Sequence, residues 1–206
     1  MQMEKKAMKT YTIIPRTEDL DWSVVPEANI DCCQWGYFAD ISAKAQLCYD
    51  EEAIYVRLSA REANIRAEEQ GQTGLPYLDS CLEFFFCPIE GNPTYFNIEM
   101  NPNCVMYLGI GTNSYNLIRL LLPEEGNLGA NAVRTEDGWA ITYRFPVSLI
   151  QRFFPGFVIR SGATMRGNFF KCGDKTVTPH YFAWNPIENE ILNFHQSQWY
   201  GQLVFA

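Results

Sequence analysis

The C-terminal third of this chain concentrates polar, aromatic and glycine residues in three segments. They are residues 166–174 (RGNFFKCGD), 179–186 (PHYFAWNP) and 194–201 (FHQSQWYG). Aromatic rings offer apolar faces, amides and charged groups offer hydrogen bonds, and glycine and proline favour loops. These residue types suit the recognition of a flat ligand with many hydroxyl groups. The segments therefore predict a binding surface rather than a reaction centre.

Two carboxylates lie in segments whose side chains alternate as they do in β-strands, with an apolar face and a polar face. The apolar faces consist of Leu82, Phe84, Phe86, Phe96, Ile98 and Met100. The polar faces consist of Asp79, Glu83, Tyr95, Asn97, Glu99 and Asn101. We expect the apolar faces to lie in the core and the polar faces to be accessible to a ligand.

Bulky apolar residues flank Glu83, so burying its carboxylate is costly unless a partner is present. The candidate partners are Arg119, Arg144, Arg166 and Lys171. Glu83 and Glu99 could contact a ligand, or belong to a solvated face or a structural ion pair. They could also act as the acid and base of a glycoside hydrolase. No second catalytic motif accompanies them, so catalysis is the least favoured of these interpretations.

The histidines and cysteines show no catalytic or metal-binding motif. His180 and His195 are fifteen residues apart, whereas zinc ligands usually come in closer pairs. Structural histidines in turns are therefore favoured, and a nucleophile pair of Cys172 with either histidine is an alternative. The seven cysteines contain no Cys-x-x-Cys pair, and several lie in apolar runs. Buried free thiols are favoured over a disulfide or zinc framework.

Two aromatic residues lie in segments rich in structure breakers, where aromatics are less typical of the core than in strands. Tyr77 ends the loop TGLPY (73–77), and Trp184 begins a Trp-Asn-Pro turn. Trp139, by contrast, lies within an expected strand. The Gly109-Ile-Gly111 segment is too short for a dinucleotide-binding fingerprint, and we interpret it as a turn.

Short runs of β-forming residues between turn residues must position these side chains. Three hairpins are expected, joining residues 43–49 to 53–60, 82–87 to 94–100, and 132–135 to 139–145. Asp137-Gly138 is the turn signal of the last hairpin. Further strands are expected at residues 158–170 and 202–205. One short helix is expected near residues 146–154, because it begins at a proline and stops before Pro155.

Many short strands with little helix and no alternation of strands with helices indicate an all-β chain. We expect a single antiparallel β-sandwich of the immunoglobulin or jelly-roll kind. The sequence shows no repeat, linker or break in composition. The expected organisation is one domain at residues 11–206, preceded by a disordered or extended tail at residues 1–10.

Composition excludes several classes of function. A chain that is 47% hydrophobic and 19% charged is not disordered, and a net charge of −8 without a basic stripe argues against nucleic acid. No segment is long and apolar enough to span a membrane. The start of the sequence lacks the apolar core of a signal peptide. Together with cysteines that show no disulfide pattern, this favours a cytoplasmic protein, and an exported form remains an alternative.

The order and spacing of these segments resemble the family 9 carbohydrate-binding modules, which belong to the DOMON-like group of β-sandwiches. The resemblance covers most of the chain. It rests on the hairpin at residues 43–60, residues 79–85 (DSCLEFF), residues 95–103 (YFNIEMNPN) and the C-terminal residues 168–174, 179–184 and 194–205. It implies non-catalytic binding of a mono- or oligosaccharide.

In modules of this family two aromatic side chains sandwich a sugar ring, while a carboxylate and amides bind its hydroxyl groups. The resemblance assigns the sandwich to Tyr77 and Trp184 and the carboxylate to Glu83. The full set of expected ligand-binding residues is Tyr77, Glu83, Asn97, Glu99, Asn101, Asn168, Lys171 and Trp184. His195 and Trp199 are expected to be structural.

The sequence also departs from the family pattern. Tyr77 stands where a tryptophan is usual, and residues 194–201 differ from the family's Phe-His-x-Pro-Glu-x-Phe-Gly ending. Some relatives bind structural calcium, but no acidic calcium loop is evident here, so no cofactor is expected. The group also includes haem binders and protein-interaction modules, which form a further alternative. Axial haem ligands would come from Met106 or Met165 with His180 or His195.

Overall fold

The computed structural model describes residues 7–33, 35–36, 40–123 and 128–206, and most of its regular structure is β. The strands up to the middle of the chain are β1 (Thr10–Pro15), β2 (Ala28–Ile30), β3 (Ser42–Tyr49), β4 (Ala53–Arg61), β5 (Cys81–Cys87), β6 (Tyr95–Met100) and β7 (Met106–Gly111). The later strands are β8 (Ile118–Arg119), β9 (Asn131–Arg134), β10 (Gly138–Pro146), β11 (Thr164–Cys172), β12 (Tyr181–Ala183) and β13 (Gly201–Phe205). The α-helix α1 spans Val147–Phe153, and the 3-10 helices include η1 (Trp22–Val24), η2 (Pro76–Leu78) and η4 (Ser197–Trp199).

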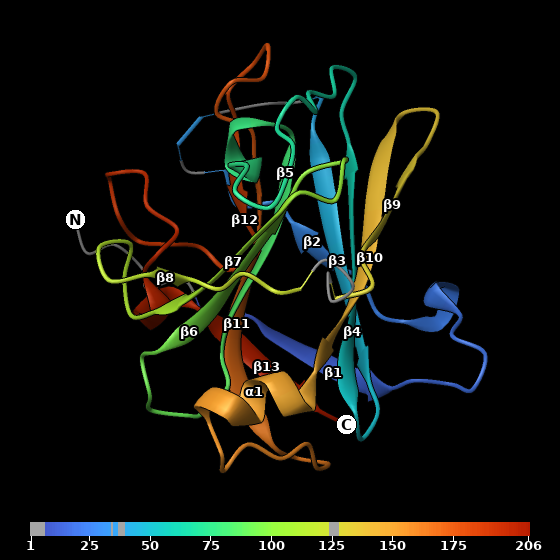
Figure 1. Cartoon of the computed structure of the whole chain (residues 1–206), viewed down its shortest axis with the longest axis vertical. Coiled ribbons are helices and arrows are strands. Elements are labelled where there is room, and N and C mark those ends of the chain that lie inside the picture. The colour runs from blue at the N-terminus through green and yellow to red at the C-terminus, as the bar shows by residue number, and fades with distance from the viewer. Residues whose placement is uncertain (1–6, 34, 37–39, 124–127) are drawn as a thin grey trace.

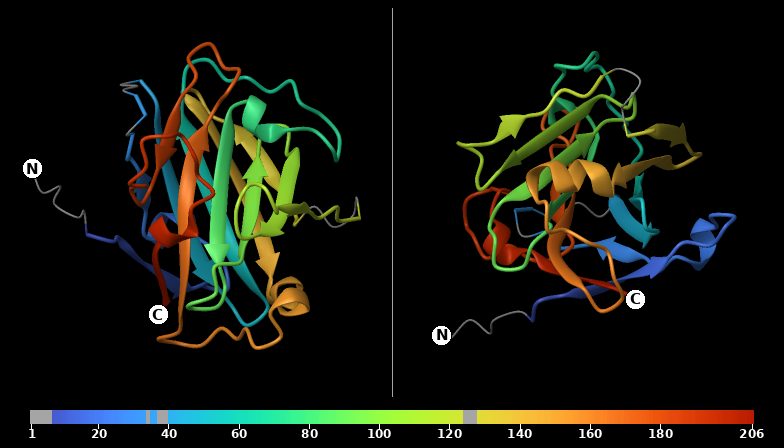
Figure 2. Two further views of the ribbon diagram at one scale, coloured as in Figure 1. Left: turned by 90° about the vertical axis from the view of Figure 1, so that its left-hand side faces the viewer. Right: turned by 60° about the horizontal axis from the view of Figure 1, so that its bottom comes forward.

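The strands form one continuous, curled sheet in the order β8-β7-β6-β5-β11-β13-β1-β3-β4-β10-β9, with β12 beside β11 and β2 beside β3. The part from β8 to β13 is called the first half here, and the part from β3 to β9 the second half. Figure 1 shows the halves side by side, with α1 at one end between them. Figure 2 shows the broad face of the first half.

Strand β1 joins the two halves. Its residues Thr10–Ile13 pair with β13, and Ile14 and Pro15 pair with β3. Both pairings are parallel, so the expectation of a purely antiparallel arrangement is wrong. The reason is that β1 inserts between two strands that run in its own direction, a long-range pairing that local alternation does not reveal. The sheet is therefore mixed, and its halves stay connected instead of separating into two sheets.

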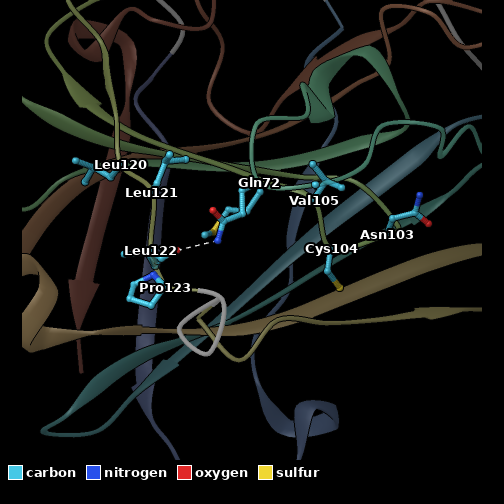
Figure 3. Close-up of a pocket in the computed structure, with 10 residues that line it drawn as sticks. Gln72, Asn103, Cys104, Val105, Leu120, Leu121, Leu122 and Pro123 are labelled. Carbon is cyan, nitrogen blue, oxygen red and sulfur yellow. Dashed lines mark hydrogen bonds between the residues drawn. The ribbon is translucent and has the colours of Figure 1, made fainter.

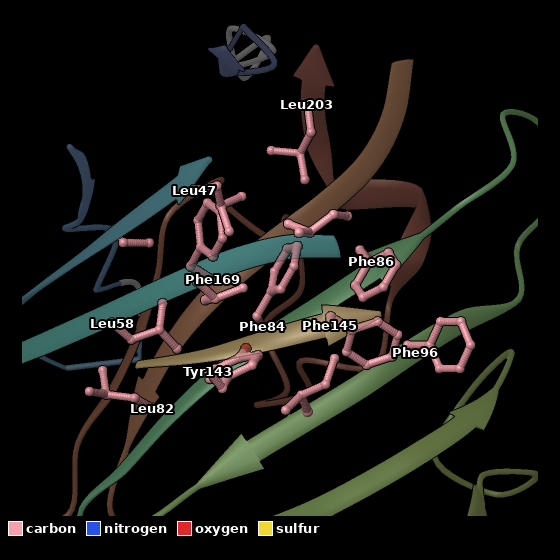
Figure 4. Close-up of a cluster of buried hydrophobic side chains, with 14 of the residues drawn as sticks. Leu47, Leu58, Leu82, Phe84, Phe86, Phe96, Tyr143, Phe145, Phe169 and Leu203 are labelled. Atoms are coloured by element: carbon pink, nitrogen blue, oxygen red, sulfur yellow. The ribbon is translucent and has the colours of Figure 1, made fainter. Parts of the chain in front are cut away.

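The main hydrophobic core lies between the two halves. Figure 4 shows Phe84, Phe86, Phe96 and Phe169 of the first half near Leu47, Leu58, Tyr143 and Phe145 of the second. The predicted apolar faces of β5 and β6 belong to this core. A second buried cluster covers the opposite face of the first half and includes residues of the C-terminal segment. Both faces of β5, β6 and β11 are thus packed.

The predicted hairpins are confirmed, as β3–β4, β5–β6 and β9–β10 pair in antiparallel register. The helix is also confirmed, with Pro146 at its N-cap. The strand expected at residues 158–170 begins later, at Thr164, because residues 160–163 form a turn in which Gly162 has φ 78°. In the described part of the chain, no helix is long and apolar enough to cross a bilayer.

One local expectation is corrected. Gly109 and Gly111 lie in strand β7 and not in a turn. Each lacks a side chain because a Cβ would come within 2.9 Å of atoms of Leu117 or Asn116. At the N-terminus, residues 1–6 of the expected tail lie outside the described residues. Lys9 is held by Asn185 and Asp31, and Thr10 already begins β1.

Candidate functional site

A cavity of about 520 Å³ opens on the outer face of the first half. Strands β5, β6, β7, β11 and β12 each contribute a lining residue, and the rest of the lining comes from η2, residues 114–117, Asp174 and residues 191–195. Its lining comprises Tyr77, Glu83, Glu99, Tyr107, Ser114, Tyr115, Leu117, Cys172, Asp174, Tyr181, Ile191, Leu192, Asn193, Phe194 and His195. The cavity thus combines buried carboxyl groups with several aromatic rings.

The two carboxyl groups lie next to each other because of strand register. Glu83 on β5 pairs directly with Glu99 on β6, and Glu99 pairs with Tyr107 on β7. Side chains of directly opposed residues lie about 4.5–5.5 Å apart at Cβ. Glu83 is 2% exposed and Glu99 is 5% exposed. The predicted polar face is therefore confirmed as a face shared by these acids, but it is largely buried.

Glu99 is partly satisfied by hydrogen bonding. Asn97 Nδ2 donates to its Oε1 at 2.9 Å, whereas Oε2 has no hydrogen-bond partner in the described structure. Burial raises the pKa of Glu99 to about 7, although the Asn97 bond and the charge of Arg119 oppose the shift. A buried oxygen without a partner is costly, so this oxygen is well suited to accept a hydrogen bond from a ligand.

Glu83 has an unusual partner. The thiol of Cys172 donates to Oε1 of Glu83 at 2.9 Å. Burial, together with the neighbouring Cys172 and Glu99, raises the pKa of Glu83 well above its usual range. The cationic partners proposed from sequence are mostly engaged elsewhere. Lys171 pairs with Glu62, and Arg119 donates to loop carbonyl groups.

Aromatic side chains surround the acids. Tyr77 lies in η2, which is held against the β11–β12 loop because Asp174 N donates to Tyr77 O at 3.0 Å. Tyr107 lies under the guanidinium of Arg119, 4.5 Å from the ring centroid. Tyr181 is the first residue of β12, and burial together with the nearby Asp174 raises its pKa to about 12. Tyr115 is 99% exposed at the cavity edge.

Trp184 does not face Tyr77 across the cavity, which corrects the expected sandwich. Its side chain is 4% exposed and packs in the main core against Tyr11 and Phe169. The physical reason is strand alternation. Phe182 on β12 also belongs to the main core, and Trp184, two residues later, continues on the same side. Tyr181 has the opposite phase and lines the cavity instead.

Lys171 is likewise placed on the core side of the sheet. It pairs with Leu82 in the β5–β11 register and is fully buried. Its Nζ forms a 3.1 Å ion pair with Glu62 and donates to Nε2 of His180 at 2.6 Å. Trp139 Nε1 also donates to Glu62, at 2.6 Å. These contacts assign Lys171 to a buried polar network and not to the cavity.

The two remaining amide side chains, Asn101 and Asn168, form hydrogen bonds that stabilise the fold. Asn101 donates to Asp79 Oδ2 at 2.8 Å and accepts from Val105 N at 2.9 Å, which holds the β6–β7 turn. Asn168 exchanges hydrogen bonds with the backbone of Asn185. Neither lines the cavity. Of the expected residues, Tyr77, Glu83 and Glu99 line it, and Asn97 supports Glu99.

Sequence reasoning missed several lining residues. Tyr107 was not identified as a site residue because Gly109 and Gly111 were interpreted as a turn and not as part of a strand. A strand there would have placed Tyr107 opposite Glu99. His195, expected to be structural, bonds Tyr95 OH through Nδ1 at 2.8 Å and also lines the cavity. Burial lowers the pKa of His195 to about 4. Tyr181 could have been found from the phase of the apolar Phe182.

One group among the described residues brings metal-ligating atoms together, consisting of Cys81, Glu83 and Cys172. Two thiols do not suit calcium, which prefers oxygen ligands, so this group does not fit the calcium of some relatives. His180, a haem-ligand candidate, has both ring nitrogens engaged, by Lys171 and by Thr178 O. Cys48, Cys81, Cys87 and Cys172 are buried thiols, as predicted.

A smaller cavity of about 250 Å³ lies apart from these residues (Figure 3). It is bordered mainly by Cys104, Val105 and residues 120–123. Gln72 Nε2 donates to Leu122 O at 3.1 Å across it. Its few polar side chains make it a weaker candidate than the larger cavity.

Comparison with known proteins gives a family match. The sequence model of carbohydrate-binding family 9 matches residues 15–205. A candidate carbohydrate-binding protein from Bacteroides uniformis is 26% identical, with a TM-score of 0.79 over 97% of this chain and 100% of that chain. No curated protein matches the chain.

Two further solved structures share the fold. Both are of a family 9 carbohydrate-binding module from Caldicellulosiruptor kristjanssonii, in complex with cellotriose and with glucose. They are 14% and 13% identical, each with a TM-score of 0.65. Both alignments cover 96% of this chain, and they cover 93% and 96% of the respective modules.

Proposed function

The chain belongs to carbohydrate-binding family 9, and we propose on that basis that it binds a sugar in the 520 Å³ cavity without catalysing a reaction. The observation that carries the proposal is the pairing of Glu83 with Glu99 in a cavity that several tyrosines also line. Carboxyl and carboxylate oxygens accept hydrogen bonds from sugar hydroxyls. Aromatic faces contact the apolar face of a pyranose.

Within this proposal, Tyr77 and Tyr181 take the role of the aromatic walls. Both are half-buried, line the cavity and approach Asp174. Glu99 Oε2 accepts a hydrogen bond from a sugar hydroxyl group, because this oxygen is buried and has no hydrogen-bond partner among the described residues. Tyr115 and Leu192 form an exposed edge that a longer saccharide could contact.

Isothermal titration calorimetry with glucose, cellobiose, cellotriose and a broader panel of sugars tests the proposal. Glucose and cellotriose are included because the family 9 module from Caldicellulosiruptor kristjanssonii was solved in complex with each of them. Tyr77→Ala and Tyr181→Ala are each expected to weaken binding by about 10- to 100-fold, the loss of roughly 1.5–3 kcal/mol for one aromatic contact. Tyr77→Phe and Tyr181→Phe keep the ring and are expected to retain most of the affinity.

Tyr55→Ala is the matched control. Tyr55 is a half-buried tyrosine on β4 in the second half, bonded to Asp50 and away from the cavity lining. Its replacement is expected to leave sugar affinity unchanged. The proposal fails if no sugar of the panel binds, or if Tyr55→Ala weakens binding as much as the cavity variants do.

The same protein tests the hydrolase alternative, which relies on Glu83 and Glu99 as acid and base. Chromogenic aryl glycosides are incubated with wild type and with Glu83→Gln. We expect no turnover. Turnover that Glu83→Gln abolishes would replace the binding proposal with an enzymatic one.

A further inference from the structure

Strand register gathers two thiols and one carboxyl group beside the cavity. Cys81 on β5 lies directly opposite Cys172 on β11 in antiparallel pairing. Glu83 lies two residues along β5, so its side chain points to the same face. One donor atom from each residue lies within 4.8 Å of the other two, and all three residues are buried. Cys81, Glu83 and Cys172, called the triangle below, are therefore positioned by paired strands and not by a loop.

This geometry suits a tetrahedral metal site. Zinc binds thiolate sulfur at about 2.3 Å, which places two sulfur ligands about 3.8 Å apart. The three donor atoms already converge on that scale, so modest side-chain rotations suffice to enclose an ion. We propose that Cys81, Glu83 and Cys172 bind a thiophilic divalent metal ion of the zinc class, with the fourth coordination position open to the cavity.

The charges around the triangle favour a cation. None of the described lysines or arginines forms an ion pair with Glu83. Among the described residues, the Cys172 thiol is the only hydrogen-bond donor to its carboxyl group. A buried acid without a counter-charge is unfavourable, and a divalent ion supplies that charge. On the open side, Glu99 is 5% exposed and its Oε2 lacks a partner in the described structure. That oxygen can support a ligand at the fourth position.

The donor set selects the kind of ion. Thiolates are soft ligands that favour zinc-like ions, whereas calcium and magnesium prefer oxygen. Three protein ligands with one open position is the pattern of a site that keeps an exchangeable ligand. The proposal goes beyond sugar binding and does not depend on it, although Glu83 serves both.

Cobalt(II) is the probe, added to the fully reduced protein without sugar. Thiolate-bound tetrahedral cobalt gives a near-ultraviolet charge-transfer band and strong visible bands. We expect both, with one equivalent of cobalt per chain and loss of the bands on adding zinc. Cys81→Ser and Cys172→Ser are each expected to lower the apparent cobalt affinity by more than about 100-fold, beyond the ~10–100-fold typical of a lost supporting contact.

Cys87→Ser is the matched control. Cys87 is a buried thiol on the same face of β5, outside the triangle. It is expected to keep the bands and the affinity. Because a cysteine variant could fail to fold, Glu83→Gln provides a second test. It keeps both thiols, so the charge-transfer band is expected to remain while the affinity falls and the visible bands shift.

Three results would overturn the proposal. One is the absence of thiolate-to-cobalt bands in reduced wild type. Another is their persistence in folded Cys81→Ser and Cys172→Ser. The third is their loss in Cys32→Ser or Cys33→Ser, which would assign the ion to that adjacent pair.

Discussion

The four side chains that the sequence ranked as the main candidates differ in what holds each of them in place. Glu83 and Glu99 are fixed by strand register, Tyr77 by a loop contact, and Trp184 by core packing. Residue types alone made all four equivalent candidates. Burial then separates them, because a 4% exposed indole packed against two aromatic rings stabilises the fold and is not free to stack on a ligand.

Trp184→Ala is therefore expected to act on stability and not on sugar affinity. Deleting a buried tryptophan removes packing in the main core and costs about 3–5 kcal/mol of unfolding free energy. Urea denaturation measures this loss. Trp22, half-buried in η1, gives the comparison variant Trp22→Ala, for which the loss should be clearly smaller.

Calorimetry on the folded Trp184→Ala protein completes this prediction. Its affinity for sugar is expected to stay within about 2-fold of wild type, well under 1 kcal/mol. A fully stable Trp184→Ala protein that no longer binds sugar would contradict the assignment of Trp184 to the core.

At the scale of elements, the alternation of β5, β6, β11 and β12 decides which residues reach the cavity. One side of each strand joins the main core and the other faces the second cluster or the cavity. Alternation was readable from sequence for β5 and β6. In β11 it assigns a charged residue, Lys171, to the core side, where Glu62 compensates it. The charge of Lys171 therefore suggested a ligand-binding role, whereas the alternation of side chains along β11 correctly places it on the core side.

Close contact between β10 and β4 depends on a glycine. A Cβ at Gly138 would lie 2.0 Å from Ala60 O, a backbone atom that cannot move aside cheaply. Gly138→Ala is expected to lower the unfolding free energy by about 1–3 kcal/mol or more, as overpacking does. Thermal unfolding with circular dichroism measures the change.

Gly156→Ala is the control for this substitution. A Cβ at Gly156 would meet nothing within 4 Å, and its φ is not in the left-handed region. The change is expected to be neutral or to stabilise by up to about 1 kcal/mol. Equal losses at the two positions would show that the β4–β10 contact is looser than described.

Across the whole molecule, the curled sheet buries a polar network inside its main core. Glu62, Lys171 and His180 meet there, with Ser80 and Trp139 completing the bonds to Glu62. Residues far apart in sequence contribute, so the network exists only when both halves are assembled. Breaking such a buried pair by removing one partner is strongly destabilising. A change in the protonation of this network is therefore expected to change the unfolding free energy of the whole domain.

His180 makes that response testable. Burial and the charge of Lys171 lower the pKa of His180 to about 4 from an ordinary value of 6.5. Between these values the unfolded chain binds a proton that the folded chain does not. Stability therefore falls as the pH drops from about 6.5 towards about 4. The contribution of this group to the unfolding free energy is on the order of 3 kcal/mol.

Urea denaturation of wild type and His180→Gln at several pH values measures the contribution of His180 to the unfolding free energy. Other acids and His195 titrate in the same range in both proteins, so the difference between the two curves isolates His180. The variant is expected to lose less stability on acidification. Parallel curves would mean that His180 is not held neutral in the folded protein.

The amino-acid sequence by itself determined the hairpins, the short helix and the phases of β5 and β6, because these depend on local alternation and turn residues. It also placed Tyr77, Glu83 and Glu99 in the polar set that lines the cavity. Only the tertiary structure decided the parallel pairing of β1, the burial of Trp184 and Lys171, and the meeting of Cys81 with Cys172. These depend on which distant strands become neighbours, and pairing across long stretches of chain leaves no local pattern for a single sequence to reveal.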